Sequence, residues 1–356
     1  MAPISIYDSS GLDQLRREHR LDPQSIRKLR NDLLKRFQPD DEVLSDFPAA
    51  AQLAMHSLEL DRQCHSEIDG ATKLLFRTAA GMLIESVLLR IATGRTTLCV
   101  SSQVGCAAAC EFCATGSMGI AQNLTAEEIL DQVLQAGQAL AAEDRRLRNL
   151  VFMGMGEPFH NEENLYRALE GLTAAELFHH SPSKILVSTV GIADAMLRCA
   201  RRFPAVNLAL SLHSVRQDVR ERLIPLAKKY PLDELRPTLV EVNRLQRCTV
   251  MIEYLMLSGV NDSPGDAQAL IDWLDGLNVH VNLIPYNPID DAPELAATDR
   301  DERDLFAGIL KQAGLKTTIR YSLGNDIAAA CGQLVKKENR EIARQQSLSL
   351  TELHCE

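Results

Sequence analysis

The stretch TTLCVSSQVGCAAACEFC (residues 96–113) joins a short apolar run to three closely spaced cysteines. The run TTLCV (96–100) is the first of six β-rich runs, and roughly 20–40 residues of helical pattern separate most of them. Repeated strand–helix alternation is typical of a parallel sheet, and six units predict a partial (β/α)6 barrel. The other runs are NLVFM (149–153), KILVST (184–189), VNLALSL (206–212), TVMIEYLML (249–257) and VHVNLIPY (279–286).

The chain divides by composition into three parts. We expect a small helical domain over residues 1–78, the barrel over 79–335 and a polar tail over 336–356. Runs such as IRKLRNDLLKRF (26–37) and AAAQLAMHSL (49–58) favour helix up to about residue 75. Inside the barrel, Thr125 and Glu128 form a capping box that predicts a helix start.

Charge is distributed unevenly along the chain. The formal net charge is −10, yet residues 16–36 hold eight basic residues against three acidic ones. A local basic patch can bind phosphate even on an acidic protein, because counterions are released locally. A solvated helix face explains the same charges equally well.

Composition also indicates the cellular compartment. The 356 residues are 46% apolar, so a large core can be buried, and no apolar stretch approaches the roughly 18 residues of a membrane span. The start MAPISIYDSS lacks the pattern of a signal peptide. We therefore expect a cytoplasmic protein without membrane contact, and a monomer. In such a compartment nine cysteines favour metal or redox chemistry over a disulfide framework.

Several polar residues follow the predicted strands. Loops at the carboxyl ends of barrel strands form the active site, so residues that follow different strands are expected to meet at one rim. These stretches are GMGEP (154–158), STVGI (188–192), SLHS (211–214) and PYNP (285–288).

The cysteine trio Cys106, Cys110 and Cys113 has the spacing C-x3-C-x2-C. Structural zinc sites use four ligands, commonly from paired C-x2-C knuckles, and no second pair of clear spacing is present. Three thiolates suit a [4Fe–4S] cluster with one open iron. An open iron can chelate the amino and carboxylate groups of a substrate.

These motifs resemble those of radical S-adenosylmethionine enzymes, and specifically the RlmN/Cfr family of RNA adenosine methyltransferases. The resemblance covers most of residues 80–335 and is strongest at the C-terminal ACGQL (330–334). It implies that the trio binds the cluster. The matching stretches are TLCVSSQVGCAAACEFCATGSMG (97–119), GMGEP, STVGI, SLH, KKYPLDEL (228–235), EYLMLSGVNDS (253–263), PYNP and GNDIAAACGQL (324–334).

The resemblance also implies a mechanism. Adenine C2 and C8 are not nucleophilic, so a polar methyl transfer fails where a carbon radical can add. One S-adenosylmethionine would methylate Cys331, and a second would yield the 5′-deoxyadenosyl radical that activates this methyl group for addition to the ring. Glu85 would take the ring proton, and Cys99 would release the RNA by forming a transient disulfide with Cys331, which a reductant then opens.

S-adenosylmethionine contacts are implied in the same way, with two molecules used per turnover. Without the resemblance, His213 would be read as a core histidine and Cys331 as a small buried residue. Glycine permits close backbone approach, and a carboxylate can accept hydrogen bonds from an ammonium group. The implied contact residues are Gly156, Glu157, Ser188, Ser211, Leu212, His213 and Asn287.

The stretch CATGSMGIAQNLT (113–125) departs from the pattern of typical RlmN sequences. It leaves C2 and C8 of adenosine open as targets, and it leaves open whether the RNA is large-subunit ribosomal RNA, transfer RNA or another RNA. A target base would have to leave its stack to enter the barrel. Two other classes stay open: a radical maturase in which Cys331 is incidental, and a zinc-bound RNA-binding protein.

Overall fold

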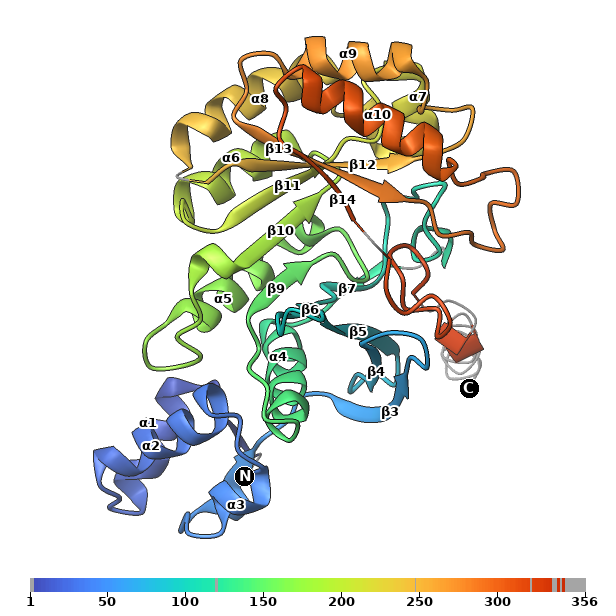
Figure 1. The fold of residues 1–356 in the computed structure, drawn as a ribbon. Coiled ribbons are helices and arrows are strands. Elements are labelled where there is room, and N and C mark those ends of the chain that lie inside the picture. Colours follow the sequence, from blue (N-terminus) through green and yellow to red (C-terminus); the bar gives the residue numbers. More distant parts are fainter. Residues whose placement is uncertain are drawn as a thin grey trace, which may run out of the picture.

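The computed structural model describes residues 3–118, 121–246, 248–320, 322–334, 338–339 and 341–342. Its centre is a curved ten-stranded sheet in the order β14-β13-β12-β11-β10-β9-β6-β5-β4-β3 (Figure 1). From β6 to β14 every pairing is parallel, whereas β3 to β6 pair antiparallel. The two ends of the sheet, β14 and β3, are not neighbours, so the barrel is partial.

The six predicted β-rich runs are confirmed as strands, and a short seventh follows them. Leu98, Leu150 and Val187 are fully buried, since helices cover one face of the sheet and the barrel interior lies on the other. The parallel strands are β6 (Thr96–Cys99), β9 (Asn149–Phe152), β10 (Ile185–Thr189), β11 (Asn207–Ser211), β12 (Val250–Met256), β13 (Val279–Pro285) and β14 (Thr317–Ile319).

Helices connect the consecutive parallel strands and cover the outside of the sheet (Figure 1). The capping box of Thr125 and Glu128 is confirmed at the start of the first of them. The helices are α4 (Ala126–Ala141), α5 (Glu162–Thr173), α6 (Ala193–Arg202), α7 (Gln217–Leu223), α8 (Leu232–Leu245), α9 (Pro264–Leu274) and α10 (Arg300–Gln312).

The N-terminal part is helical only at its beginning. It contains β1 (Ile4–Ser5), α1 (Ser9–Glu18), α2 (Pro23–Arg30), a π-helical turn (Asn31–Lys35) and α3 (Asp40–Leu44). The prediction of helix from residue 49 to 75 is wrong. After a 3-10 turn the chain forms β2 (Leu53–Ala54), β3 (Glu59–His65) and β4 (Ala71–Arg77). Strand pairing overrides the helical propensity: β2 pairs with β1, and β4 pairs with β5 (Leu83–Arg90).

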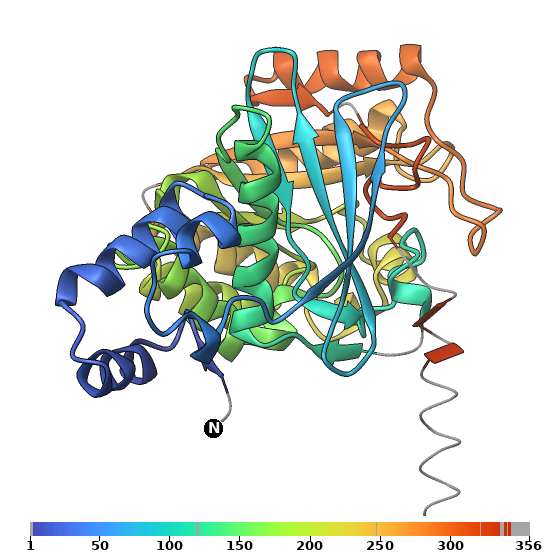
Figure 2. The ribbon, with the colours of Figure 1, turned by 90° about the horizontal axis from the view of Figure 1, so that it is seen from below.

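His56 ties the N-terminal helices to the barrel. Its Nε2 lies 2.7 Å from Asp40 of α3 and its Nδ1 lies 2.7 Å from Asp131 of α4. The buried Asp131 also accepts hydrogen bonds from the amides of Ser57 and Leu58. Figure 2 shows the N-terminal helices, in blue, beside α4.

The protonation state of His56 follows from these contacts. Burial alone would lower the pKa of His56, but its hydrogen bonds to Asp131 and Asp40 outweigh burial and raise the pKa to about 10. The imidazolium is therefore charged at neutral pH and pairs with two carboxylates.

In the described part of the chain, no helix combines the length and the apolar character that crossing a bilayer requires. The polar tail predicted over residues 336–356 falls largely outside the described residues, apart from 338–339 and 341–342.

The His56 contact predicts a pH-dependent contribution to stability. Because folding raises the pKa of His56 from 6.5 to about 10, this contribution is complete below pH 6.5 and is lost as the pH rises through 10. At pH 6, His56→Ala should lower the free energy of unfolding by about 2 kcal/mol, measured by denaturant titration. At pH 10.5 the difference from the wild type should shrink; an equal difference at both pH values would contradict the assignment.

Candidate active site

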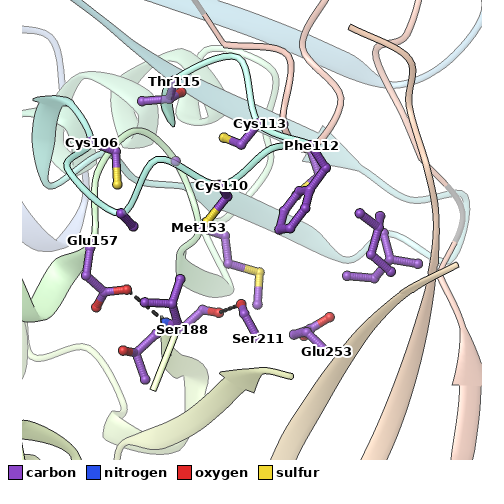
Figure 3. Close-up of a pocket in the computed structure, with 18 of the residues that line it drawn as sticks. Cys106, Cys110, Phe112, Cys113, Thr115, Met153, Glu157, Ser188, Ser211 and Glu253 are labelled. Carbon is purple, nitrogen blue, oxygen red and sulfur yellow. Dashed lines mark hydrogen bonds between the residues drawn. The ribbon is translucent and has the colours of Figure 1, made fainter. Parts of the chain in front are cut away.

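A cavity opens at the carboxyl ends of the parallel strands (Figure 3). This is the rim where barrel enzymes carry their reactive groups. Residues that follow β6, β9, β10 and β11 reach it, as the sequence predicts. Its walls include Cys106, Cys110, Phe112, Cys113, Met153, Gly154, Gly156, Glu157, Ser188, Ser211, His213, Glu253, Arg320 and Cys331.

The cysteine trio lies on one wall of this cavity (Figure 3). A short antiparallel pair, β7 (Gln103–Gly105) and β8 (Ala121–Asn123), flanks the cysteine loop. Burial, with a smaller effect of the neighbouring thiols, raises the pKa of the Cys106 thiol to about 12 and that of Cys110 well above its usual value. Buried thiols need a cationic partner before they become thiolates.

Three cysteine thiols on one cavity wall are the type of donor that a [4Fe–4S] cluster takes. Among the residues that the structure describes, no three His, Cys, Asp or Glu side chains form a group that could hold a single metal ion. A [4Fe–4S] cluster binds each thiolate through a different iron, so the three sulfurs need not converge on one point. Cys106, Cys110 and Cys113 therefore fit the cluster that their spacing implies.

The GMGEP loop is packed tightly against β7. Gly156 has a φ of +100°, and a Cβ placed there would lie 2.6 Å from the Cβ of Gln103. The amide of Glu157 donates to Gln103 Oε1, 2.9 Å away. The Glu157 carboxylate accepts from the amides of Phe159 and Val190, at 3.1 and 2.9 Å. Burial raises its pKa to about 7 despite these hydrogen bonds.

Two hydroxyls face each other across neighbouring strands on the cavity wall. Ser188 Oγ of β10 and Ser211 Oγ of β11 are 3.4 Å apart, and Figure 3 shows both beside Met153. A ribose or an amino acid head group can bond to such a pair. Their positions support both residues as ligand contacts.

His213 combines a structural role with a place on the cavity wall. Its Nδ1 accepts from the amide of Leu255 at 3.0 Å, and its ring meets Phe112 edge to face with centroids 4.8 Å apart. Burial, together with the charge of Arg220, lowers its pKa to about 3. The neutral ring can contact a ligand without carrying charge.

Two of the predicted contact residues do not line the cavity. Leu212 is fully buried, and its carbonyl accepts from Arg220. Asn287 donates to the carbonyl of Cys331 at 3.2 Å. Both residues therefore shape neighbouring segments: Leu212 through its main chain, and Asn287 through the loop that carries Cys331.

Cys331 lies on the wall of the same cavity as the trio. As a residue it is exposed, but its thiol faces the cavity, and burial raises the pKa of this thiol. A second, smaller cavity is lined by Cys331 and Cys99 together. Burial, and then the charge of Cys331, raises the pKa of Cys99 to about 12. Both cysteines are free thiols.

The loop of Cys331 is bonded directly to the cysteine loop. The amide of Ala114 donates to the carbonyl of Gly332 at 2.7 Å. Gly332 has a φ of +88°, and a Cβ there would lie 3.1 Å from the carbonyl oxygen of Phe112. The glycine in ACGQL thus permits the close approach that places Cys331 beside the trio.

Glu85 is buried on β5, with 1% of its side chain exposed, and it does not line either cavity. It lies on the same face of β5 as Val87 and Leu89, two residues that line the smaller cavity, because alternate residues share a face. Its carboxylate is therefore directed to the side of the sheet on which Cys99 and Cys331 meet.

Sequence reasoning missed two charged residues of the cavity wall. Glu253 interrupts the apolar strand β12, and its Oε2 accepts from Asn282 at 2.7 Å. Arg320 follows β14, is half-buried, and its charge favours the thiolate forms of Cys99 and Cys331. A charged residue within an apolar strand is the signal that could have identified Glu253.

Comparison with known proteins agrees with this geometry. A family model described as the Radical SAM superfamily matches residues 100–273. A probable RNA methyltransferase of Rhodopirellula baltica is 62% identical over 344 residues, which cover 97% of this chain and 91% of that protein. The chain belongs to the RlmN/Cfr family of radical S-adenosylmethionine RNA methyltransferases.

Other members of the family are also similar over most of their length. A probable dual-specificity RNA methyltransferase RlmN of Thermus thermophilus is 41% identical over 274 residues, 77% of each chain. The crystal structure of a radical SAM methyltransferase from Sphaerobacter thermophilus has a TM-score of 0.87 and 37% identity, covering 93% of this chain and 99% of that one. The partial barrel and the methyltransferase class are thereby confirmed.

The tight packing of Gly156 predicts a selective effect of an added methyl group. Gly156→Ala should lower the free energy of unfolding by at least about 2 kcal/mol, because the Cβ adds a clash with Gln103 to an unfavourable backbone conformation. The control is Gly276→Ala, which also has a positive φ (+73°) but no atom within 4 Å of its Cβ. Denaturant titration measures both; equal losses would contradict the packing argument.

Proposed function

We propose that this methyltransferase adds a methyl group to a ring carbon of adenosine, C2 or C8, with Cys331 as the covalent carrier. The observation that supports it most is the position of Cys331. It shares one cavity with Cys106, Cys110 and Cys113 and a second with Cys99. A carrier needs both neighbours: a source of radical chemistry and a thiol that releases the product.

Cys106, Cys110 and Cys113 would hold a [4Fe–4S] cluster through three irons, and the fourth iron would stay open. Gly156, Glu157, Ser188, Ser211 and His213 line the space for S-adenosylmethionine. When bound, cluster and S-adenosylmethionine supply the carbon radical and the electron exchange that addition to a closed-shell ring requires.

Cys331 and the residues around it carry out methyl transfer and proton removal. Cys331 takes a methyl group from a first S-adenosylmethionine, and its sulfur later carries the carbon that joins the RNA. Glu85 accepts the proton of the ring carbon, whose C–H electron pair stays in the purine. Arg320 interacts with both reactive thiols and with Glu253, and its charge favours the thiolate forms.

Cys99 releases the product. Its sulfur attacks the sulfur of Cys331, so that an S–S bond forms while the bond from Cys331 to the carbon breaks with its electron pair on the carbon. That carbon takes up a proton and becomes the methyl group. A dithiol reductant must then open the disulfide before the next turnover, which suits a cytoplasmic enzyme.

We propose large-subunit ribosomal RNA as a substrate, and transfer RNA as a second one. The words "dual-specificity" in the name of the Thermus thermophilus relative favour more than one RNA. The adenine must leave its stack to reach the cavity, which favours a loop or an unfolded segment. Exposed basic side chains on α1 and α2, such as Arg17, Arg27 and Lys28, can bind its phosphates.

The release step predicts a trapped intermediate. Cys99→Ala should stop the reaction after addition, because no thiol remains to displace Cys331, and protein joined to RNA should accumulate. Denaturing gel electrophoresis with labelled 23S ribosomal RNA detects the adduct, and peptide mapping should locate it at Cys331. Cys248→Ala, remote from the site, should turn over normally. Free methylated RNA at the wild-type rate from Cys99→Ala would contradict this role.

A further inference from the structure

Lys73 contacts two parts of the site that are remote from each other in sequence. Its Nζ lies 3.3 Å from Glu85 Oε1 and 3.4 Å from the carbonyl oxygen of Ala328. Ala328 is three residues before Cys331 and has a φ of +48°. One ammonium group therefore connects the carboxylate on β5 with the loop that carries the reactive cysteine.

The register of the sheet explains the pairing with Glu85. Leu75 of β4 lies opposite Glu85, and Lys73 lies opposite Val87. Lys73 and Glu85 are thus diagonal neighbours on one face of the antiparallel pair, within reach for a long side chain. Only 15% of the Lys73 side chain and 1% of the Glu85 side chain are exposed. A carboxylate buried this deeply needs a counter-charge, and Lys73 supplies it.

The turn between β3 and β4 holds the same loop at other points. The amide of Gly324 donates to Asp69 at 2.8 Å. Asp326 accepts from the hydroxyl of Ser66 and the amide of Glu67, at 2.8 and 2.9 Å. The loop of Cys331 is therefore docked along this hairpin. Lys73, on strand β4 of the hairpin, contacts both this loop and Glu85.

We propose that Lys73 is a positioning residue: it holds the Glu85 carboxylate and the Cys331 loop in the relative position that removal of the ring proton requires. This inference rests on the proposed function, in which Glu85 is the base. In that step the ring C–H bond breaks, its electron pair stays in the purine, and an O–H bond forms on Glu85. Lys73 keeps its bond to Ala328 throughout, so the loop stays in place while the carboxylate becomes neutral.

Lys73→Met tests the proposal, because it keeps an unbranched side chain only one atom shorter and removes the charge. We expect normal methylation of Cys331, accumulation of the protein–RNA adduct and release of methylated RNA slowed about tenfold. With 23S ribosomal RNA deuterated at adenosine C2 and C8, the slowed release should show a deuterium isotope effect. Lys73→Arg should restore much of the rate, and Lys311→Met, on the exposed end of α10, is the matched control.

Glu85→Gln is measured in parallel, so that the results separate the role of Lys73 as positioning residue from the role of Glu85 as base. An adduct with both Glu85→Gln and Lys73→Met supports the inference. An adduct with Glu85→Gln alone overturns the role of Lys73 and leaves Glu85 as the base. No adduct with Glu85→Gln removes the base from the proposed function, and the inference with it. Loss of Cys331 methylation in Lys73→Met would place Lys73 in an earlier step and overturn the proposal.

Should Lys73→Met fail to fold, as judged by circular dichroism, Lys73→Gln replaces it in the same comparison. A glutamine can still donate to the Ala328 carbonyl but carries no charge toward Glu85. Slow release with the isotope effect in Lys73→Gln supports the role of the charge, whereas wild-type release overturns it.

Discussion

The hydrogen bond from the Ala114 amide to the Gly332 carbonyl, 2.7 Å long, connects two segments that are more than two hundred residues apart. It fixes the end of the Cys331 loop to the cysteine loop, so the lone cysteine faces the same cavity as the trio. The barrel makes this possible because residues 106–113 follow its first strand, whereas residues 322–334 follow its last strand, β14. The two segments of the site therefore come from the first and last parallel strands of the sheet.

Burial controls the protonation of the cysteine thiols in the site. It raises the pKa values of Cys99, Cys106, Cys110 and Cys331, so the thiols remain protonated until a positive group lies beside them. Arg320 lowers the pKa of Cys99 and Cys331 but does not outweigh burial, and a bound cluster would supply positive charge beside the trio.

The sequence predicted what local pattern determines. Buried parallel strands are continuous apolar runs, so all six were visible, and the capping box of Thr125 was readable from four residues. It did not predict β3, because Glu59–His65 is an exposed edge strand with no apolar alternation. The alanine-rich stretch before it favours helix locally, and only the pairing of the strands decides otherwise.

Within the site, motifs predicted the residues that line the cavity but not their partners. Glu157 and Ser188 follow strands and were expected at the rim, where they lie. The contact of Lys73 with Glu85 depends on the register of β4 against β5, which no motif records. Asn287 stays a predicted ligand contact, and its bond to the carbonyl of Cys331 could not be predicted, because the fold of that loop was not readable from sequence.

The most direct measurement is mass spectrometry of Cys331 in protein isolated anaerobically with its cluster and S-adenosylmethionine. The account predicts one added methyl group on the peptide that contains Cys331, and none on peptides that contain Cys64, Cys199 or Cys248. An unmodified Cys331 beside an intact cluster would contradict the role of Cys331 as carrier and indicate a radical enzyme of another kind.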